Sequence, residues 1–136
     1  MTMRSIDELI EVAKEVRLRA YAPYSGYLVG VGIESASGEV FKGCNVENIS
    51  YGLTICAERN AISTMVANDQ RLIRQIALVT IDGGLPCGMC LQTIREFTDD
   101  PSELRIHIAN LDGLLFSKTL ADLLPFGFRS DQVHRT

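Results

Sequence analysis

The chain has 136 residues, 46% of them hydrophobic, so it is long enough to bury one core, and we expect a single domain over residues 1–136. Its formal net charge is −4 and its thirteen Lys and Arg residues are scattered, which argues against tight, non-specific binding of nucleic acid and favours a small substrate. The first residues carry acids early and contain no long apolar run, so we expect no signal peptide, no membrane anchor and a cytoplasmic protein with reduced cysteines.

The first predicted element is an amphipathic helix. Ser5 is a candidate N-cap with Glu8 three residues later, and apolar residues then recur at helical spacing from Ile6 to Ala20. The charged residues of this segment, Arg17 among them, are interpreted as a solvated face.

A β-hairpin is predicted next, after a turn-rich connector over Tyr21–Gly26. Apolar and β-branched residues predict strands over Tyr27–Glu34 and Glu39–Val46, and Ser35–Gly38 supplies the turn between them. Binding residues usually lie where a strand runs into a loop. Three polar residues occupy that place: Asn45, Glu47 and Asn48.

A second helix is predicted to begin near Thr54, a candidate N-cap. Its apolar positions suit packing on a sheet: Ala57, Ala61, Ile62, Met65 and Val66. Cys56 and Glu58 then lie at the start of this helix. Unpaired backbone N–H groups and the positive end of the helix dipole favour a thiolate there.

The remaining elements alternate between strands and helices. They are predicted as strand Arg74–Ile81, helix Met89–Phe97, strand Leu104–Ala109, short strand Leu114–Phe116, and a last helical turn capped by Ser117 and running through Leu124. The whole order predicts an α/β fold, a three-layer α/β/α sandwich with a mixed five-stranded sheet.

Three cysteines have the spacing of zinc ligands. A Cys-x-x-Cys step, here Cys87 and Cys90, lets two thiolates converge on one ion from a single turn of chain, and Cys56 supplies a third. Three protein ligands leave the fourth position to water, which is the arrangement of a catalytic rather than a structural zinc.

Glu58 distinguishes this pattern from a generic metal site. It lies two residues after Cys56, at an offset that turns the carboxylate away from the ligand direction but leaves it close to a water at the open position. The pairing of ligand-x-Glu with Pro-Cys-x-x-Cys is the signature of zinc nucleobase deaminases, with Cys in place of the first His. We expect Glu58 to move protons between that water and the substrate.

Other interpretations of these residues stay open. The Cys-x-x-Cys step alone is also typical of a redox pair, and Cys44 could complete a closed, four-thiolate structural zinc site. Asn45 could serve only as a turn residue and Arg59 only as a surface residue of its helix. His107 in a strand and His134 near the end are not favoured as ligands.

Three stretches resemble the small homotetrameric cytidine deaminases, and the resemblance runs over nearly the whole chain. They are Tyr21-Ala-Pro-Tyr-Ser25, the segment from Gly43 to Ile62 that contains Cys-Ala-Glu-Arg, and Pro86-Cys-Gly-Met-Cys-Leu-Gln92. The resemblance implies a zinc hydrolase that converts cytidine and deoxycytidine to the uridines and releases ammonia in pyrimidine salvage. It implies a homotetramer with shared active sites.

The resemblance also assigns roles to single residues. It implies zinc ligation by Cys56, Cys87 and Cys90, proton transfer by Glu58, and hydrogen bonds from Arg59 to the ligand thiolates. Substrate contacts are implied for five residues: Tyr27, Asn45, Glu47, Ala57 and Phe128. Asn45 and Glu47 would bind the ribose hydroxyls, Tyr27 stands where the family usually has a phenylalanine against the base, and Phe128 would enter a neighbouring subunit's site.

The sequence departs from the family pattern near the second motif. Leu85 stands where serine or proline is common, the 82–85 loop looks short, and Leu91 replaces an arginine. Because that loop is expected to border the pocket, a relative acting on a modified or antibiotic cytosine nucleoside is an alternative. A non-enzymatic structural-zinc module is a further one. Four apolar residues near the end would be unusual on the surface of a lone domain this small, which suggests a subunit contact: Leu123, Leu124, Phe126 and Phe128. A C-terminal segment folded on its own core is the alternative.

Overall fold

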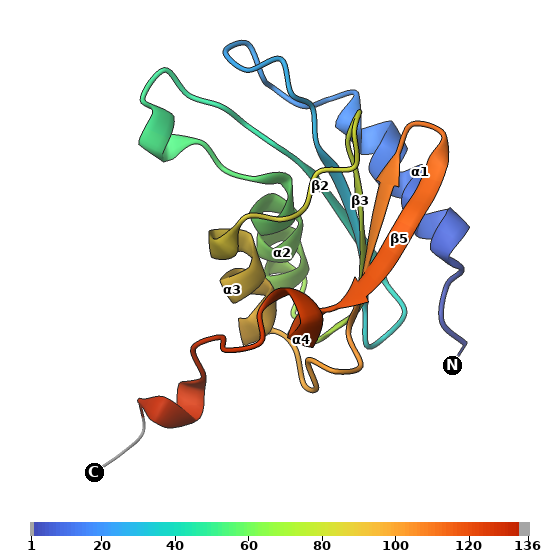
Figure 1. Cartoon of the computed structure of the whole chain (residues 1–136), viewed down its shortest axis with the longest axis vertical. Helices are drawn as coiled ribbons and strands as arrows, with labels where there is room; N and C mark the ends of the chain where they lie inside the picture. Colours follow the sequence, from blue (N-terminus) through green and yellow to red (C-terminus); the bar gives the residue numbers. More distant parts are fainter. Residues whose placement is uncertain (1, 134–136) are drawn as a thin grey trace.

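The computed structural model describes residues 2–133, in which a five-stranded sheet is covered by helices (Figure 1). The helices are α1 (Ile6–Arg17), α2 (Ala57–Ala67), α3 (Gly88–Glu96) and α4 (Leu120–Leu123), with 3₁₀ turns η1 (Tyr51–Leu53) and η2 (Ser130–Gln132). The strands are β1 (Gly30–Ser35), β2 (Val40–Cys44), β3 (Ile73–Val79), β4 (Arg105–Asn110) and β5 (Gly113–Thr119). His134 lies outside the described residues.

The sheet has the strand order β2-β1-β3-β4-β5. β1 pairs antiparallel with both β2 and β3, β3 pairs parallel with β4 through the α3 crossover, and β4 pairs antiparallel with β5. A parallel pair needs a crossover of this kind, whereas antiparallel neighbours can be joined by tight turns. The predicted mixed five-stranded sheet is confirmed.

The helices lie on both faces of the sheet. On one face, Leu9 and Ala13 of α1 pack with Ala77 and Val79 of β3, and α2 and α3 cover the other face (Figure 1). The larger apolar cluster lies on the α2 and α3 side and contains the inward residues of β1, β3 and β4. The predicted three-layer sandwich is therefore confirmed.

Among residues 2–133, no helix combines the length and the apolar character needed to cross a membrane.

The first helix begins as predicted but ends earlier. The Ser5 hydroxyl accepts a hydrogen bond from the Glu8 N–H at 3.1 Å, which confirms the N-cap. The helix stops at Arg17 instead of Ala20. Interpreting Arg17 as solvated was wrong, because it is 9% exposed and its Nε donates to the Leu28 carbonyl at 3.1 Å.

The hairpin strands are shorter than predicted. β1 begins at Gly30 rather than Tyr27, because the backbone of the preceding residues bonds to a side chain instead of a strand. The Asn45 Oδ1 accepts from the Val29 N–H and its Nδ2 donates to the Tyr27 carbonyl, both at 2.9 Å. A local sequence pattern does not show such a bond between residues 16 and 18 positions apart.

Two predicted helix caps were wrong. Cys56, not Thr54, is the N-cap of α2, and Thr54 ends the 3₁₀ turn η1. Thr119, not Ser117, caps α4, where its hydroxyl and the Asp122 carboxylate form a reciprocal capping box. Ser117 remains inside β5. Ser117 and Thr119 are both favoured cap residues, so sequence alone does not choose between them, whereas Cys56 begins α2 without a side-chain cap bond and gives no cap signal in the sequence.

Gly43 lets β2 and α2 approach closely. A Cβ on this residue would lie 2.5 Å from the Ala61 nitrogen and 2.6 Å from the Ala57 carbonyl oxygen. Real Cβ atoms do not make such contacts, so only glycine permits this packing distance. The approach sets the height of α2 above the sheet, and with it the position of Cys56 and Glu58 at the start of the helix.

Candidate active site

Two helix starts bring three cysteines together. Cys56 is the N-cap of α2 and Cys87 the N-cap of α3, and Cys90 follows one turn later. Their three Sγ atoms all lie within 4.8 Å of one another, and the Cys87 and Cys90 Sγ atoms are 3.4 Å apart. Cys56 and Cys87, which are 31 positions apart in the sequence, thus belong to one sulfur cluster.

The cluster fits a zinc ion. Zinc binds thiolate sulfur at about 2.3 Å, and a tetrahedral arrangement separates two such sulfurs by about 3.8 Å. The sulfurs of the cluster need to move only slightly to meet these values. Cys44 does not belong to the group, so within residues 2–133 the cluster has three members and the predicted four-thiolate alternative loses its fourth ligand. A simple redox pair does not account for Cys56 beside the other two.

Two hydrogen-bond donors face the Cys56 sulfur. The Cys90 thiol and the Arg59 guanidinium both donate toward the Cys56 sulfur, which lowers the pKa of Cys56 to about 5. The Arg59 Nη2 lies 3.9 Å from this sulfur and also donates to the Thr54 carbonyl at 3.1 Å. Cys56 is therefore disposed to be a thiolate, the form in which cysteine binds metal.

A pocket of about 290 Å³ opens beside the cluster. Its wall contains seven of the residues predicted for the site: Tyr27, Asn45, Glu47, Cys56, Ala57, Glu58 and Cys87. Metal ligands, an acid and polar groups from separate segments thus converge on one concave surface, as a small-molecule site requires.

Glu58 is almost fully buried at this pocket. It is 4% exposed, and burial raises the pKa of its carboxyl group above the ordinary value. A carboxyl group with a raised pKa can take up and return a proton near neutral pH. The side chain therefore has the environment that a general acid and base needs.

The Asn45 side chain is 7% exposed and bonded to the backbone around Tyr27. An amide carries two N–H donors and two lone pairs, and these bonds use one of each. One donor and one acceptor thus remain for another partner. The alternative of a turn residue explains the backbone bonds but not the place of Asn45 in the pocket wall.

The Glu47 carboxylate is held from one side by the loop before β1. It accepts hydrogen bonds from the Tyr24 and Ser25 N–H groups, at 2.9 and 3.1 Å, and from the Ser25 hydroxyl. The hydroxyl bond is the main reason that the pKa of Glu47 is lowered. Glu47 is therefore an oriented anion in the pocket wall.

The comparisons with known proteins agree with this site. The family described as the cytidine and deoxycytidylate deaminase zinc-binding region matches residues 3–102. The chain belongs to this family.

Relatives and solved structures support the assignment across the length of the deaminase. Cytidine deaminases of Sporosarcina psychrophila and Halalkalibacterium halodurans are 35% and 37% identical, over 94% and 93% of this chain and 94% and 96% of theirs. The crystal structure of cytidine deaminase from Burkholderia pseudomallei has a TM-score of 0.85 and 41% identity, over 92% of this chain and all of that one. The structure from Mycobacterium tuberculosis has a TM-score of 0.80 and 34% identity, over 93% of this chain and 98% of that one. The chain is thus an enzyme of a zinc-binding deaminase family, and zinc is its cofactor.

Phe128 of the deaminase does not reach the pocket of its own chain. It is 60% exposed and follows α4, where the chain runs away from the sheet (Figure 1). Its backbone is held at both ends by Gln92 of α3, whose Nε2 donates to the Phe128 carbonyl at 2.9 Å and whose Oε1 accepts from the Phe128 N–H at 3.0 Å. Its neighbour Phe126 is 96% exposed.

The pocket of the deaminase also contains residues that sequence reasoning did not assign. Ser25, Thr80 and Gly84 line it with four further residues: Val29, Thr54, Leu78 and Leu85. Ser25 lies in a stretch that carries the resemblance, and the 82–85 loop was expected to border the pocket. Thr80, at the end of a buried strand, had no signal in the sequence.

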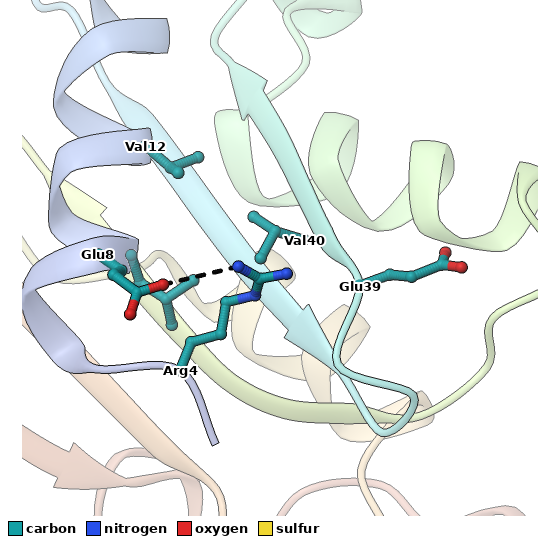
Figure 2. A pocket seen from close by; sticks show the side chains of 6 residues that line it. Arg4, Glu8, Val12, Glu39 and Val40 are labelled. Atoms are coloured by element: carbon teal, nitrogen blue, oxygen red, sulfur yellow. Dashed lines mark ion pairs between the residues drawn. The ribbon is translucent and has the colours of Figure 1, made fainter. Parts of the chain in front are cut away.

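A second hollow lies on the α1 side of the sheet (Figure 2). It measures about 440 Å³ and has an apolar floor of Leu9, Val12 and Val40. Arg4 crosses it toward Glu8, with Nη1 3.6 Å from Oε2, and Figure 2 shows Glu39 directed away from that pair. The hollow contains neither a cysteine nor a histidine, so the deaminase chemistry belongs to the smaller pocket.

Proposed function

We propose that this chain catalyses the hydrolytic deamination of cytidine and deoxycytidine to uridine and deoxyuridine with release of ammonia. The observation that carries the proposal is the buried Glu58 carboxyl group in a pocket lined by Cys56 and Cys87, which belong to a cluster of three cysteine sulfurs. The names of the related cytidine deaminases give the substrate class. The proposed setting is pyrimidine salvage in the cytoplasm, where the three thiols stay reduced.

Cys56, Cys87 and Cys90 are the proposed zinc ligands. When bound, the ion supplies a Lewis acid that lowers the pKa of a water molecule toward neutrality. Three thiolates donate much negative charge to the ion and so weaken its ability to lower the pKa of water. Arg59 beside Cys56 withdraws part of this charge from the sulfur and restores some of that ability.

Glu58 moves the protons of the reaction. Its carboxylate accepts a proton from the attacking water and delivers it to N3 of the pyrimidine, while the water oxygen adds to C4. Glu58 then transfers the second proton of that water to the exocyclic amine. The bond between C4 and the amine nitrogen breaks, ammonia leaves, and the ring retains the proton on N3. Burial of Glu58 supports this role, because a raised pKa makes the carboxylate a stronger base toward the attacking water.

Asn45 and Glu47 are proposed to bind the ribose hydroxyls. The orientation of the Glu47 carboxylate by the Tyr24 and Ser25 N–H groups supports this, as does the unused donor and acceptor on Asn45. Pocket groups built to bind hydroxyls discriminate against ligands that lack them. We therefore expect cytosine, without ribose, to be a poor substrate. Tyr27 and Ala57 complete the proposed substrate wall.

We also propose a homotetramer in which Phe128 enters the site of a neighbouring subunit. Its exposure, and the pair of hydrogen bonds by which Gln92 presents it, support a role outside its own pocket. The edge strand β5 adds an apolar surface of the kind that marks subunit contacts: Leu114, Leu115 and Phe116.

Leu85 gives the second candidate some support. It lines the pocket and is 56% exposed, so an apolar group stands where it can meet a substituent on the base. A modified or antibiotic cytosine nucleoside is therefore the alternative substrate. The structural-zinc module has less support, because Cys44 does not belong to the sulfur cluster.

The test is an absorbance assay of purified, zinc-loaded protein on cytidine, deoxycytidine, cytosine and N4-substituted cytidines. We expect turnover of both nucleosides, with ammonia released in equal amount, and little turnover of cytosine. Turnover of a substituted nucleoside alone would favour the alternative. A zinc-loaded protein that leaves every compound unchanged would overturn the proposal.

A further inference from the structure

A hydrogen bond ties the two walls of the pocket together. Tyr27 belongs to the wall that carries Asn45 and Glu47, and its backbone is bonded to Asn45. Its hydroxyl crosses to the opposite wall and donates to Asp82 Oδ1 at 2.6 Å. Asp82 lies in the loop between β3 and α3 that leads to Cys87.

The loop around Asp82 is organised to receive the tyrosine. Asp82 Oδ1 also accepts from the Thr80 hydroxyl at 3.3 Å, and the Thr80 Oγ1 accepts from the Gly84 N–H at 2.8 Å. A Cβ on Gly84 would overlap the Tyr27 hydroxyl, so the phenol rests directly against the loop backbone. The bond from Tyr27 lowers the pKa of Asp82, which keeps the acceptor ionised at neutral pH.

We propose that Asp82 is a positioning residue that, through the Tyr27 hydroxyl, fixes the distance between the two walls of the nucleoside pocket. The inference rests on the proposed function and adds a determinant of substrate fit to it. Asp82 does not line the pocket, whereas Tyr27, Thr80, Gly84 and Leu85 do. Asp82 therefore acts through these four residues and does not touch the substrate.

The fixed distance determines which pyrimidines fit. Tyr27 donates this bond and Leu85 lies on the loop that accepts it, so loosening the bond lets the two walls separate. A wider pocket binds cytidine less well and rejects a larger base less strongly. 5-Methylcytidine is the suitable probe, because the added methyl group enlarges the base and leaves the departing amine unchanged.

The experiment is a double-mutant cycle of Tyr27→Phe, Asp82→Ala and the double variant in the zinc-loaded protein. We expect each single variant to raise KM for cytidine about three- to tenfold, the size expected for one hydrogen bond to a charged group at a partly exposed position, with kcat changed less than about twofold. Because both changes remove the same bond, the double variant should be no worse than either single one. The preference for cytidine over 5-methylcytidine should fall in all three.

Asp99→Ala is the matched control, because Asp99 is an exposed acid outside the pocket wall. It should leave KM and the preference unchanged. Hydrogen exchange of residues 80–85, measured by mass spectrometry, should quicken in Asp82→Ala and not in the control. Additive KM effects in the cycle, or an Asp82→Ala variant with normal KM and normal exchange, would overturn the inference.

The two proposals fail in different ways. A wild-type protein that does not deaminate cytidine refutes the proposed function, and the exchange measurement then still decides whether Asp82 holds the loop. An active wild type with no coupling between Tyr27 and Asp82 refutes the positioning role alone.

Discussion

At the scale of single residues, burial decides which ionisable groups can do chemistry. Glu58 and Glu47 line the same pocket, yet burial raises the pKa of the first and a hydroxyl bond lowers that of the second. One carboxyl group can therefore exchange protons near neutral pH, while the other remains an anion that accepts hydrogen bonds. The same residue type serves two roles because its surroundings differ.

Glu58→Gln tests the first of these roles. The amide has nearly the same shape but cannot take a proton from water, so we expect kcat for cytidine to fall about 10²- to 10⁴-fold. Zinc content should stay near one ion per chain, because Glu58 is not one of the three clustered sulfur residues. Steady-state kinetics and metal analysis of the same sample make the test, and substantial residual turnover would contradict the role.

At the scale of elements, the sheet contains a row of hydrogen-bonded polar side chains that links four strands, β1, β3, β4 and β5. The His107 Nδ1 lies 2.7 Å from the Ser117 Oγ and its Nε2 lies 2.9 Å from the Gln75 Oε1, while the Gln75 Nε2 donates to the Glu34 carboxylate at 2.8 Å. Glu34, Gln75 and His107 are almost completely buried. Each polar group in this row has a partner, which offsets the cost of burying it.

The burial of His107 in this row predicts that the free energy of unfolding falls in acid. Burial lowers the pKa of His107 in the folded protein below the ordinary value near 6.5, so the unfolded chain takes up the proton first. The contribution of His107 is thus complete above about pH 6.5 and is lost as the pH falls below that value. Chemical denaturation at pH 7.5 and 5.5 should show a smaller fall in the free energy of unfolding for His107→Gln than for wild type. Equal falls would contradict the assignment.

The packing of β2 on α2 gives a second prediction at this scale. Gly43→Ala places a Cβ against the α2 backbone, so we expect a loss of about 1–3 kcal/mol in the free energy of unfolding. Because α2 carries Cys56 and Glu58 at its start, activity and zinc affinity should fall as well. Gly52→Ala is the control, since its Cβ would meet no atom within 4 Å. Similar losses in both variants would argue against this packing role.

At the scale of the whole molecule, the single chain leaves its apolar C-terminal segment without a cover. Phe126 and Phe128 are both exposed, and the segment that carries them runs away from the sheet (Figure 1). The pocket, by contrast, draws its walls from loops on one end of the sheet. A neighbouring subunit would both cover the aromatic residues and complete the pocket, which is the physical basis of the proposed tetramer.

Mixing two defective variants tests this sharing of sites. Phe128→Ala should raise KM, and Glu58→Gln should lower kcat about 10²- to 10⁴-fold, each in its own homo-oligomer. In a co-expressed mixture, some sites combine an intact Glu58 with an intact Phe128 from the other variant. We expect those sites to lower the apparent KM below that of Phe128→Ala alone, in kinetics of the purified mixed assembly. A mixture that behaves as the sum of its two components would contradict shared sites.

Much of the site follows from sequence because its key groups lie close together along the chain. Two residues separate Cys87 from Cys90, and one separates Cys56 from Glu58. Spacings this short let local backbone geometry limit where the side chains lie. The N-cap at Ser5 and the mixed sheet were predictable for the same reason, since caps and strand patterns repeat over a few residues. The burial of Arg17 was not, because its side chain bonds to a carbonyl eleven residues away.

Sequence alone determined the zinc chemistry, the acid beside it and the fold class, because these depend on residue type and on spacing within short segments. Only the tertiary structure decided how the 82–85 loop is held, where β1 begins and that Phe128 lies outside the pocket of its own chain. Those features depend on contacts such as Tyr27 with Asp82, 55 residues apart, and Gln92 with Phe128, 36 residues apart. No local sequence pattern predicts such pairs, because their hydrogen bonds form only when the folded chain brings the two residues together.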